Sequence, residues 1–596
     1  MASRSTRWLV ERGGLLALAC LGVYVSIAPA HLSTGDNGEF AGLGAMGGAA
    51  HPSGYPLYVL WLRAWSWLPV ETPAHATAIA TALLGAAMVL VLHAACRAWG
   101  ASSPAATFTV ALVAATPLVV RLSSEAEVFA LNALVAATVL WLAAPGGPVR
   151  GSKRAALLGL VAGLGLANHM TCALLAPIGL YGVVLGVREA PRARVVVTAA
   201  SVGALVVGLL PYAYLLVVPE TRGSWGKVDG LAGLAHHVLR MDYGGPGELA
   251  AHDGGGTPAA NLAWLAGTLV RGFVVLPLLV GLATLGVRAV RPGPERIAWI
   301  LLAASWLLAG PVLMARFNLA PEGPHAFITQ RFHMLPLVVL AVPVAVGLHA
   351  VGGRLGARVS SGALRRAGVL AVLATVLMLG LQVIALPRIA SERSRALEAS
   401  LANMLTTLPP DAVVIGTPEE YMFGSAYLQG ARGVRPDVLA ITWQLIALPH
   451  VRARIHRETG VLVEKLAPGS PQKLSVVTAE KLLATGRPLF IDPFQSNIAA
   501  SFPLYPYGLL YRVLPRGTPV PPIAEVFAIN KALYEQFDLA YPRPHVEQVV
   551  AAHYHERHAA MWRALARGLA QAGLRDEAAY AAELATALAP VNGWTR

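Results

Sequence analysis

Two carboxylates and a histidine stand close together near the start of the chain, in DNGEFAGLGAMGGAAHPSGYPLY, residues 36–58. Asp36 and Glu39 are three residues apart, so a helix through 36–50 places both on one face. Small residues, mostly glycine and alanine, separate this pair from His51 and allow close approach of other backbone segments. Acids in a loop can simply keep it hydrated. Here the surroundings favour a different interpretation, a cleft that holds a substrate.

A turn and an aromatic segment follow the acid pair. The turn HPSGYP sets two prolines around a glycine and forces the chain to change direction. PLYVLWLRAWSWL, residues 56–68, is rich in the aromatic side chains that suit the boundary between lipid and water. We therefore expect the cleft at a membrane surface, with His51 and Tyr55 binding substrate. His51 has three open roles: proton carrier, phosphate partner or hydrogen-bonding residue of the turn.

Polar residues also interrupt the later apolar runs. His169, flanked by Asn168 in ANHMT, lies between two apolar halves, where a polar side chain is costly and usually faces a cavity. Glu127 starts the helical segment EVFALN, where an acid can bind substrate or only compensate the helix dipole. Trp225 lies in the polar segment PETRGSWGKVDG. We expect Glu127, Asn168 and Trp225 to bind substrate.

Two arginines lie in the polar segment before a late apolar run, ARFNLAPEGPHAFITQRFH, residues 315–333. Guanidinium groups bind phosphate oxygens through two parallel hydrogen bonds, so Arg316 and Arg331 are candidate phosphate ligands. The alternative is that arginines at the ends of membrane spans extend toward the headgroups.

The composition is that of a membrane protein. Of 596 residues, 56% are apolar and 13% are charged, whereas soluble domains average about 25% charged residues. The net charge of +14 is spread in short groups between apolar runs, which excludes a nucleic-acid partner and is typical of charges that orient a membrane protein. Cys20, Cys96 and Cys172 all lie in apolar segments, so we expect neither a disulfide framework nor a cysteine metal site.

Apolar runs of suitable length predict about eleven spanning helices. The runs are 13–30, 74–94, 104–120, 126–144, 155–167, 172–187, 195–217, 263–287, 297–315, 333–350 and 367–387. With a cytoplasmic N-terminus, the basic residues between runs fall on one side, as the positive-inside rule requires. The polar segments that carry the candidate site then share the opposite, extracytoplasmic face. We expect an integral protein of a bacterial inner (cell) membrane.

The chain changes character after about residue 388. DAVVIGT and RPDVLAIT are typical of buried strands, and helical stretches lie between them. We therefore predict a transmembrane domain, 1–387, whose first outer loop is 31–73, then an extracytoplasmic α/β domain, 388–540, and a helical end, 541–596. The end matches tetratricopeptide spacing at Trp562, Leu565, Gly573, Ala578, Ala585, Leu588 and Pro590. A single repeat cannot bury its own face, so we expect a helical hairpin docked on the tail, with protein binding as the alternative.

The motifs D-x-G-E-F, H-P-x-G-Y-P-L, E-V-F-A-L-N, N-H-M-T and S-W-G together resemble a family of polytopic membrane proteins formerly of unknown function. Its animal member is an endoplasmic-reticulum protein O-mannosyltransferase of plexin and receptor-kinase domains. The family resembles the GT-C glycosyltransferases, which share multi-span helical folds, an acidic first outer loop and polyprenyl-phosphate sugar donors. The likeness is strong over about 30–340 and looser in the tail. Ser53 stands where the family usually has a second proline.

The resemblance implies a mainly α, GT-C-like membrane enzyme that moves a sugar, with mannose as the candidate, from a polyprenyl phosphate to a hydroxyl acceptor. The acceptor would be a protein Ser or Thr, or a glycan, and the product inverted. Asp36 is then the base and Glu39 its orienting partner, while Arg316, Arg331 and His169 neutralise the phosphate. No cofactor is expected; two acids could bind a divalent cation, but no third ligand is evident.

The competing function is a transporter or flippase of a lipid-linked or anionic substrate. Transporters also carry polar residues within the membrane, usually near its midplane and between inverted repeats. Here the polar segments crowd one face, and the two halves of the sequence show no inverted repeat. The sequence therefore favours a transferase.

Overall fold

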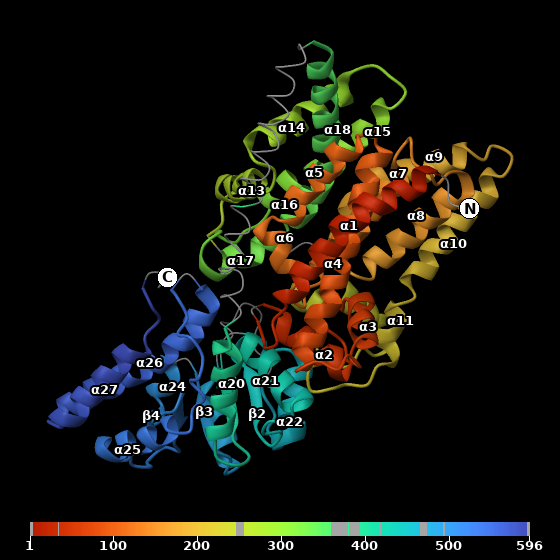
Figure 1. Ribbon diagram of the computed structural model, residues 1–596. Coiled ribbons are helices and arrows are strands. Elements are labelled where there is room, and N and C mark those ends of the chain that lie inside the picture. Colours follow the sequence, from red (N-terminus) through yellow and green to blue (C-terminus); the bar gives the residue numbers. More distant parts are fainter. Residues whose placement is uncertain are drawn as a thin grey trace.

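A computed structural model describes residues 4–33, 35–245, 255–358, 380, 394–416, 419–464, 474–492, 495–546 and 548–592 of the chain. An elongated bundle of helices forms one part of the molecule, and an α/β domain with a helical end lies below it (Figure 1). The principal helices of the bundle are α1 (Arg4–Ser26), α4 (Pro73–Ala98), α5 (Ser103–Ala114), α6 (Pro117–Leu122), α7 (Phe129–Ala143), α8 (Gly151–Leu166), α9 (Ala176–Arg188), α10 (Arg194–Leu209), α13 (Pro258–Phe273), α14 (Val275–Val290), α15 (Arg296–Leu307) and α18 (Met334–Arg358).

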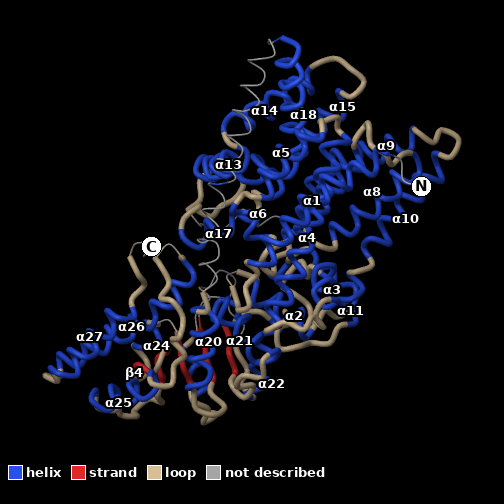
Figure 2. The backbone as a smooth tube through the Cα atoms, in the orientation of Figure 1, coloured by secondary structure: helices blue, strands red, loops and turns tan. Residues whose placement is uncertain are grey.

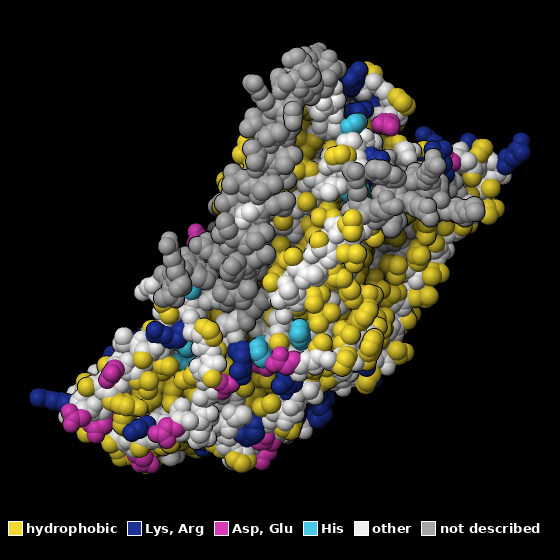
Figure 3. Space-filling model, viewed as in Figure 1, with side chains coloured by type: hydrophobic (Ala, Val, Ile, Leu, Met, Phe, Trp, Pro, Cys, Tyr) yellow, Lys and Arg dark blue, Asp and Glu magenta, His cyan; other side chains and the backbone are white. Residues whose placement is uncertain are grey.

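The bundle has the surface of a membrane domain. In the described part of the chain, five helices are long and apolar enough to span a membrane, or six if one bent pair counts as a span. Hydrophobic side chains cover much of the visible side of the bundle, whereas charged side chains gather at its far end and over the α/β domain (Figure 3). Val195, Val196 and Val202 of α10 are 83%, 70% and 59% exposed, as expected for contact with lipid chains.

Two predicted spans are wrong as single helices, because each is divided between two helices. Residues 263–287 form parts of α13 and α14, which meet at an angle of 108°. Val274 between them has φ +62°, a backbone conformation that a β-branched residue cannot take inside a helix. The run 104–120 ends its first helix at Ala114, and Pro117 starts the next one. The last predicted span, 367–387, lies outside the described residues apart from a single position.

The loop between α1 and α4 contains two short helices, α2 (Asn37–Met46) and α3 (Pro56–Ala64). The predicted helix through 36–50 is thus present but ends at Met46, because Gly47 and Gly48 have φ +79° and +122°. Helix α2 is almost wholly buried and packs against α3, α4 and α21 (Glu419–Ala431) of the tail. A Cβ atom on Gly38 would lie 3.1 Å from the backbone nitrogen of Gly424, so the glycine permits this close contact. The acid-bearing helix therefore lies between the bundle and the tail.

The tail is built on a five-stranded sheet in the order β2-β1-β3-β5-β4 (Figure 2). The first two strands are the ones expected from DAVVIGT and RPDVLAIT. Strand β1 runs parallel to both β2 and β3, whereas β5 is antiparallel to β3 and β4. The strands are β1 (Val413–Gly416), β2 (Leu439–Thr442), β3 (Leu489–Ile491), β4 (Leu504–Tyr507) and β5 (Leu510–Val513), and the helices beside them are α20 (Ala396–Thr407), α22 (Pro449–Thr459), α23 (Val476–Ala484), α24 (Ser496–Ala499) and α25 (Ile523–Tyr534).

The chain ends in a pair of helices, α26 (Val549–Gln571) and α27 (Arg575–Leu588), that pack against each other. Trp562 of α26 is fully buried, and its ring lies 5.0 Å from that of Tyr534 in α25. Ala585 and Leu588 are buried in the same hydrophobic core. The residues with tetratricopeptide spacing thus include buried packing residues of this hairpin, while a protein-binding role remains a prediction.

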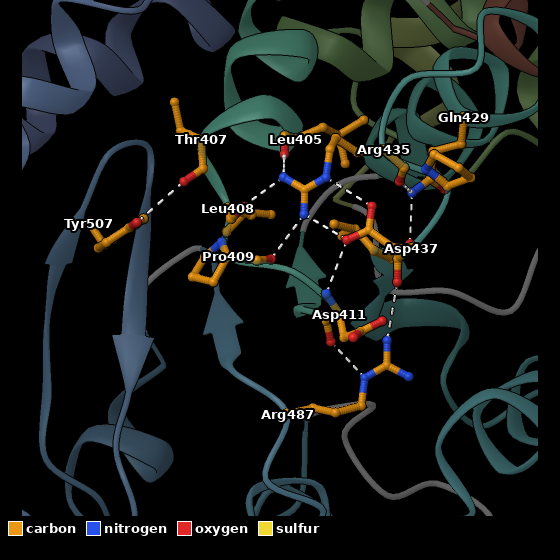
Figure 4. Close-up of polar contacts among 12 residues, drawn as sticks. Leu405, Thr407, Leu408, Pro409, Asp411, Gln429, Arg435, Asp437, Arg487 and Tyr507 are labelled. Carbon is orange, nitrogen blue, oxygen red and sulfur yellow. Dashed lines mark hydrogen bonds and ion pairs between the residues drawn. The ribbon is translucent and has the colours of Figure 1, made fainter.

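An arginine network fixes the first helix of the tail to its sheet (Figure 4). Arg435 donates hydrogen bonds to the carbonyl oxygens of Leu405, Leu408 and Pro409, at or beyond the end of α20. It also donates two bonds, of 2.8 and 2.7 Å, to the carboxylate of Asp437. The last carbonyls of a helix lack partners within it, so Arg435 satisfies groups that would otherwise be unpaired.

Replacing this arginine should destabilise the tail. We expect Arg435→Met to lower the free energy of unfolding by about 2–4 kcal/mol, because several charged hydrogen bonds are lost at once. Arg516→Met is the matched control, since the ion pair of Arg516 with Glu480 is exposed on both sides. The control should change stability by less than about 0.5 kcal/mol. Thermal unfolding of the full chain in detergent measures both, and equal melting temperatures for the two variants would contradict the assignment.

Candidate active site

A three-residue ion cluster joins distant parts of the bundle. Arg331, the last residue of α17 (Gly323–Arg331), donates from Nη1 to Oδ2 of Asp36 and to Oε1 of Glu127, each at 2.9 Å. Asp36 precedes α2, and Glu127 lies in the turn between α6 and α7. The side chain of Arg331 is 10% exposed, and that of Glu127 is fully buried. Three segments of the chain that are far apart in sequence therefore share one site.

A second cluster forms around Glu39, in the first turn of α2. Oε1 of Glu39 accepts a bond from the backbone N–H of His51, at 2.7 Å, and Oε2 of Glu39 lies 2.6 Å from Nδ1 of the same histidine. The hydroxyl of Tyr55 lies 3.0 Å from Nε2 of His51. Glu39 is fully buried, so its carboxylate fixes the position of the HPSGYP turn as well as the orientation of the imidazole. The structure thus brings both predicted turn residues to the acid pair.

Asp36 and Glu39 differ in their ionisation. Burial raises the pKa of Asp36, but the charges of Arg331 and His51 outweigh it and bring the pKa below its usual range. Burial raises the pKa of Glu39, against the opposing charge of His51. Burial also opposes the charge on His51, yet Tyr55, Glu39 and Asp36 raise its pKa well above 6.5. Asp36 is therefore ionised at neutral pH, whereas Glu39 and His51 form a buried pair that holds a proton.

Among the acids of this site, Glu127 is the one whose charge changes most around neutral pH. Burial raises its pKa to about 7, with the charges of Asp36 and Glu125 adding to the effect and that of Arg331 opposing it. The Arg331 guanidinium stays charged, since the charges of Glu127 and Asp36 outweigh burial and raise its pKa. The cluster therefore holds one permanent cation, one permanent anion and one group that titrates near pH 7.

His169 lies on the aromatic side of the site. Its ring stacks on Tyr55, with centroids 5.6 Å apart, and is 5.2 Å from Phe129. Burial and the nearby charges of Arg240 and Arg331 lower the pKa of His169 to about 3. The imidazole is therefore neutral. A neutral imidazole can form a hydrogen bond with a phosphate, and a role of His169 in binding the donor phosphate stays a prediction.

Asn168 and Trp225 have clear structural contacts. The amide of Asn168 donates to the carbonyl of Val128, 3.3 Å away, and so supports the turn that carries Glu127. The ring of Trp225 lies 6.1 Å from that of His51, and its Nε1 donates to Oδ2 of Asp242 at 2.8 Å. Trp225 thus forms a wall of the site, whereas Asn168 supports the backbone of the turn that carries Glu127.

The two arginines predicted to bind phosphate are placed differently. Arg331 is at the centre of the ion cluster. Arg316 follows α16 (Leu313–Ala315) and is exposed, and among the described residues no ion pair or side-chain hydrogen bond joins it to that cluster. The exposed position fits an arginine that extends toward the headgroup region.

A second cation that the sequence analysis missed lies beside the turn. Arg240, in the RMDYGG segment, donates from Nη1 to the backbone carbonyl of Pro52 and contacts the hydroxyl of Tyr55. Its guanidinium also lies 4.8 Å from the ring centroid of Tyr243. The signal that could have found it is the one used for Arg331, an arginine on the face that the positive-inside rule leaves poor in cations.

Part of the chain matches a known protein family. Residues 36–190, which include both acids, match the family model of the Protein O-mannosyl-transferase TMEM260 N-terminal domain. The chain is 24% identical over 447 residues to Protein O-mannosyl-transferase TMEM260 of Mus musculus, covering 73% of this chain and 63% of that protein. It is 24% identical over 375 residues to the protein of that name from Dictyostelium discoideum, covering 57% and 44%. The chain thus spans less than two thirds of the length of these relatives.

The fold has a counterpart among solved structures. The crystal structure of ArnT from Cupriavidus metallidurans bound to undecaprenyl phosphate superposes with a TM-score of 0.51. The two share 16% identity, and the match covers 87% of this chain and 100% of ArnT. The expected GT-C-like helical fold and the family resemblance are both confirmed.

Proposed function

We propose that this protein is a membrane glycosyltransferase that moves a sugar from a polyprenyl-phosphate carrier to a hydroxyl group. The observation that carries the proposal is the ion cluster, in which Arg331 bonds to both Asp36 and Glu127 beside the first membrane helices. The names of the relatives support a mannose donor and a protein Ser or Thr acceptor. The ArnT complex supports an undecaprenyl-type carrier.

The chemistry assigned to Asp36 is proton removal. Its carboxylate, ionised at neutral pH, takes the proton of the acceptor hydroxyl as that oxygen attacks the anomeric carbon of the sugar. The bond from that carbon to the phosphate oxygen breaks, and polyprenyl phosphate leaves with the electron pair. The phosphate is already a stable anion and needs no proton from the enzyme. Attack opposite the leaving group inverts the anomeric centre.

The chemistry assigned to Arg331 is recognition of the leaving phosphate. Its Nη1 atom bonds to both carboxylates, while its buried Nε atom has no hydrogen-bond partner in the part of the chain that the structure describes. A phosphate oxygen would satisfy this atom and would stabilise the charge that develops as the sugar leaves. Ionised Glu127 competes with the phosphate for the same guanidinium.

That competition predicts a pH dependence of donor binding. Because the pKa of Glu127 is about 7, its carboxyl is mostly neutral at pH 6 and mostly ionised at pH 8. We expect the KM for the donor to rise by about three- to tenfold between these pH values. In Glu127→Gln, which cannot titrate, the KM should be flat over the same range. A flat wild-type profile, or an equal slope in the variant, would contradict the role of Glu127.

We also propose that the site and the tail lie on the extracytoplasmic side. The support is the distribution of basic residues between the apolar runs, which favours a cytoplasmic N-terminus. The acid-bearing helix α2 packs on α21, so the tail must lie on the same side of the membrane as the acids.

A donor-cleavage assay separates a transferase from a transporter. The purified protein in detergent is given a polyprenyl-phosphate sugar labelled in the lipid, together with Ser- or Thr-containing peptides. A transferase releases labelled polyprenyl phosphate, and the release depends on the peptide. A flippase has no second compartment to fill in detergent and leaves the donor intact, so an intact donor would refute the proposal.

A further inference from the structure

A cavity of about 290 Å³ lies where the tail meets the loop that carries the S-W-G motif. Its lining comes from α21, β2 and α22 of the tail and from residues 220–224 of the loop. The cavity is separate from the ion cluster around Arg331, and the chemistry described above does not use it. Helix α21 packs against α2 at the base of the bundle (Figure 1).

Two residues of the lining each carry a buried polar atom that has no hydrogen-bond partner among the described residues. Nε of Arg454 donates to Glu458 at 3.0 Å, but its Nη2 atom is buried and makes no hydrogen bond. Nε2 of His450 is also buried and makes no hydrogen bond within the described residues. The His450 ring packs on Trp225, with centroids 5.2 Å apart. Unpaired buried polar groups are costly, and a guanidinium N–H requires an acceptor. A ligand with acceptor oxygens would satisfy these atoms.

The charges around the cavity favour an anionic ligand. Three arginines and two glutamates line it. Arg457 pairs with Glu220 at 3.2 Å, and Arg454 pairs with Glu458. Arg222 is bonded to the neutral side chain of Gln429 and to the carbonyl of Pro436. One positive charge is therefore left without an acid in the lining.

An aromatic wall connects the cavity to the acid pair. Phe423 lines the cavity, and its ring lies 6.4 Å from that of His51. Trp225 lies 6.1 Å from His51 and contacts His450 on the side of the cavity. Since an extended chain advances about 3.3 Å per residue, crossing this wall takes about three or four residues. The cavity and His51 are therefore separated by the length of a short peptide segment.

We propose that this cavity binds an acidic side chain of the acceptor polypeptide, a few residues from the hydroxyl that receives the sugar. The inference rests on the proposed transferase function and adds to it a sequence preference of the acceptor. The carboxylate of a glutamate or aspartate accepts hydrogen bonds from Arg454 and from the Nε2–H tautomer of His450. The neighbouring hydroxyl then reaches Asp36 across the wall of Trp225 and Phe423.

The test uses paired peptides that contain one Ser or Thr and differ only in Glu or Gln three or four residues away. For the wild type we expect a KM for the Glu peptide about tenfold lower than for the Gln peptide, the worth of one charged hydrogen bond. Arg454→Gln should remove the difference through KM with little change in kcat, and Arg454→Lys should keep part of it. Arg516→Gln, an equal charge change on a distant exposed side chain, should keep all of it.

Two kinetic results with these peptides would overturn the inference. One is equal KM values for the two peptides with the wild type, and the other is a preference that survives Arg454→Gln. Calorimetric binding of the peptides to the full chain separates this inference from the proposed function. Preferential binding of the Glu peptide that depends on Arg454, without any sugar transfer, would support the cavity and refute the transferase. Absence of both binding and transfer, or transfer to a glycan alone, would refute the cavity as a peptide site.

Discussion

Asp36→Asn is expected to lower the rate of sugar transfer by about 10³-fold or more, within the range seen when a general base and its charge are removed. Asparagine has nearly the same shape and its oxygen can still accept the bond from Arg331, which is 2.9 Å away in the wild type. It cannot take a proton from the acceptor hydroxyl. The loss should therefore appear in kcat, with the melting temperature nearly unchanged.

The matched control for this substitution is Asp229→Asn. Asp229 lies in the polar segment PETRGSWGKVDG, its side chain is 74% exposed, and its partner Lys227 is exposed as well. The same chemical change there should leave transfer at the wild-type rate. Initial rates with labelled donor and acceptor peptide measure both variants. Full activity in Asp36→Asn would remove the base from the mechanism.

Arg331→Lys is expected to lower kcat/KM for the donor by about 10²-fold, because lysine keeps the charge but loses the planar fork that binds two oxygens at once. The ammonium can still pair with one of the two carboxylates, so the variant should fold. Complete removal of the cation, as in Arg331→Met, leaves Asp36 and Glu127 unpaired in a buried site and should cost about 3–5 kcal/mol of stability. The lysine variant therefore separates donor recognition from folding.

Arg192→Lys provides the control for the arginine substitution. Arg192 is exposed in the turn between α9 and α10, at the opposite end of the bundle from the tail. Its replacement should change neither the KM for the donor nor kcat. If Arg331→Lys behaved in the same way, the guanidinium would not be the phosphate ligand.

The sequence sufficed for the parts of the fold that depend on local patterns. Apolar runs located the helices of the bundle, the spacing of Asp36 and Glu39 located α2, and two short buried runs located β1 and β2. Each of these depends on the periodicity of neighbouring residues. The bend at Val274 was missed because nothing in the apolar pattern reports a single residue with φ +62°.

The candidate site was predictable in its residue types but not in its pairing. Arg331 lies 295 residues from Asp36 in sequence, and no local pattern says that it, and not Arg316, reaches the first outer loop. In the sequence, Glu127 could not be distinguished from an acid that only compensates a helix dipole. Arg240 was missed because its role depends on the packing of a distant loop on Pro52 and Tyr55. Tertiary contacts decide all three cases.

The central claim is that Asp36, together with Arg331, transfers a sugar from a lipid phosphate to a hydroxyl. The most direct measurement uses a donor labelled with one isotope in the sugar and another in the lipid phosphate. With purified wild-type protein and acceptor, labelled sugar on Ser or Thr and free polyprenyl phosphate should appear at equal rates, and both should fall to background in Asp36→Asn. Release of sugar to water alone, or equal transfer by the variant, would contradict the claim.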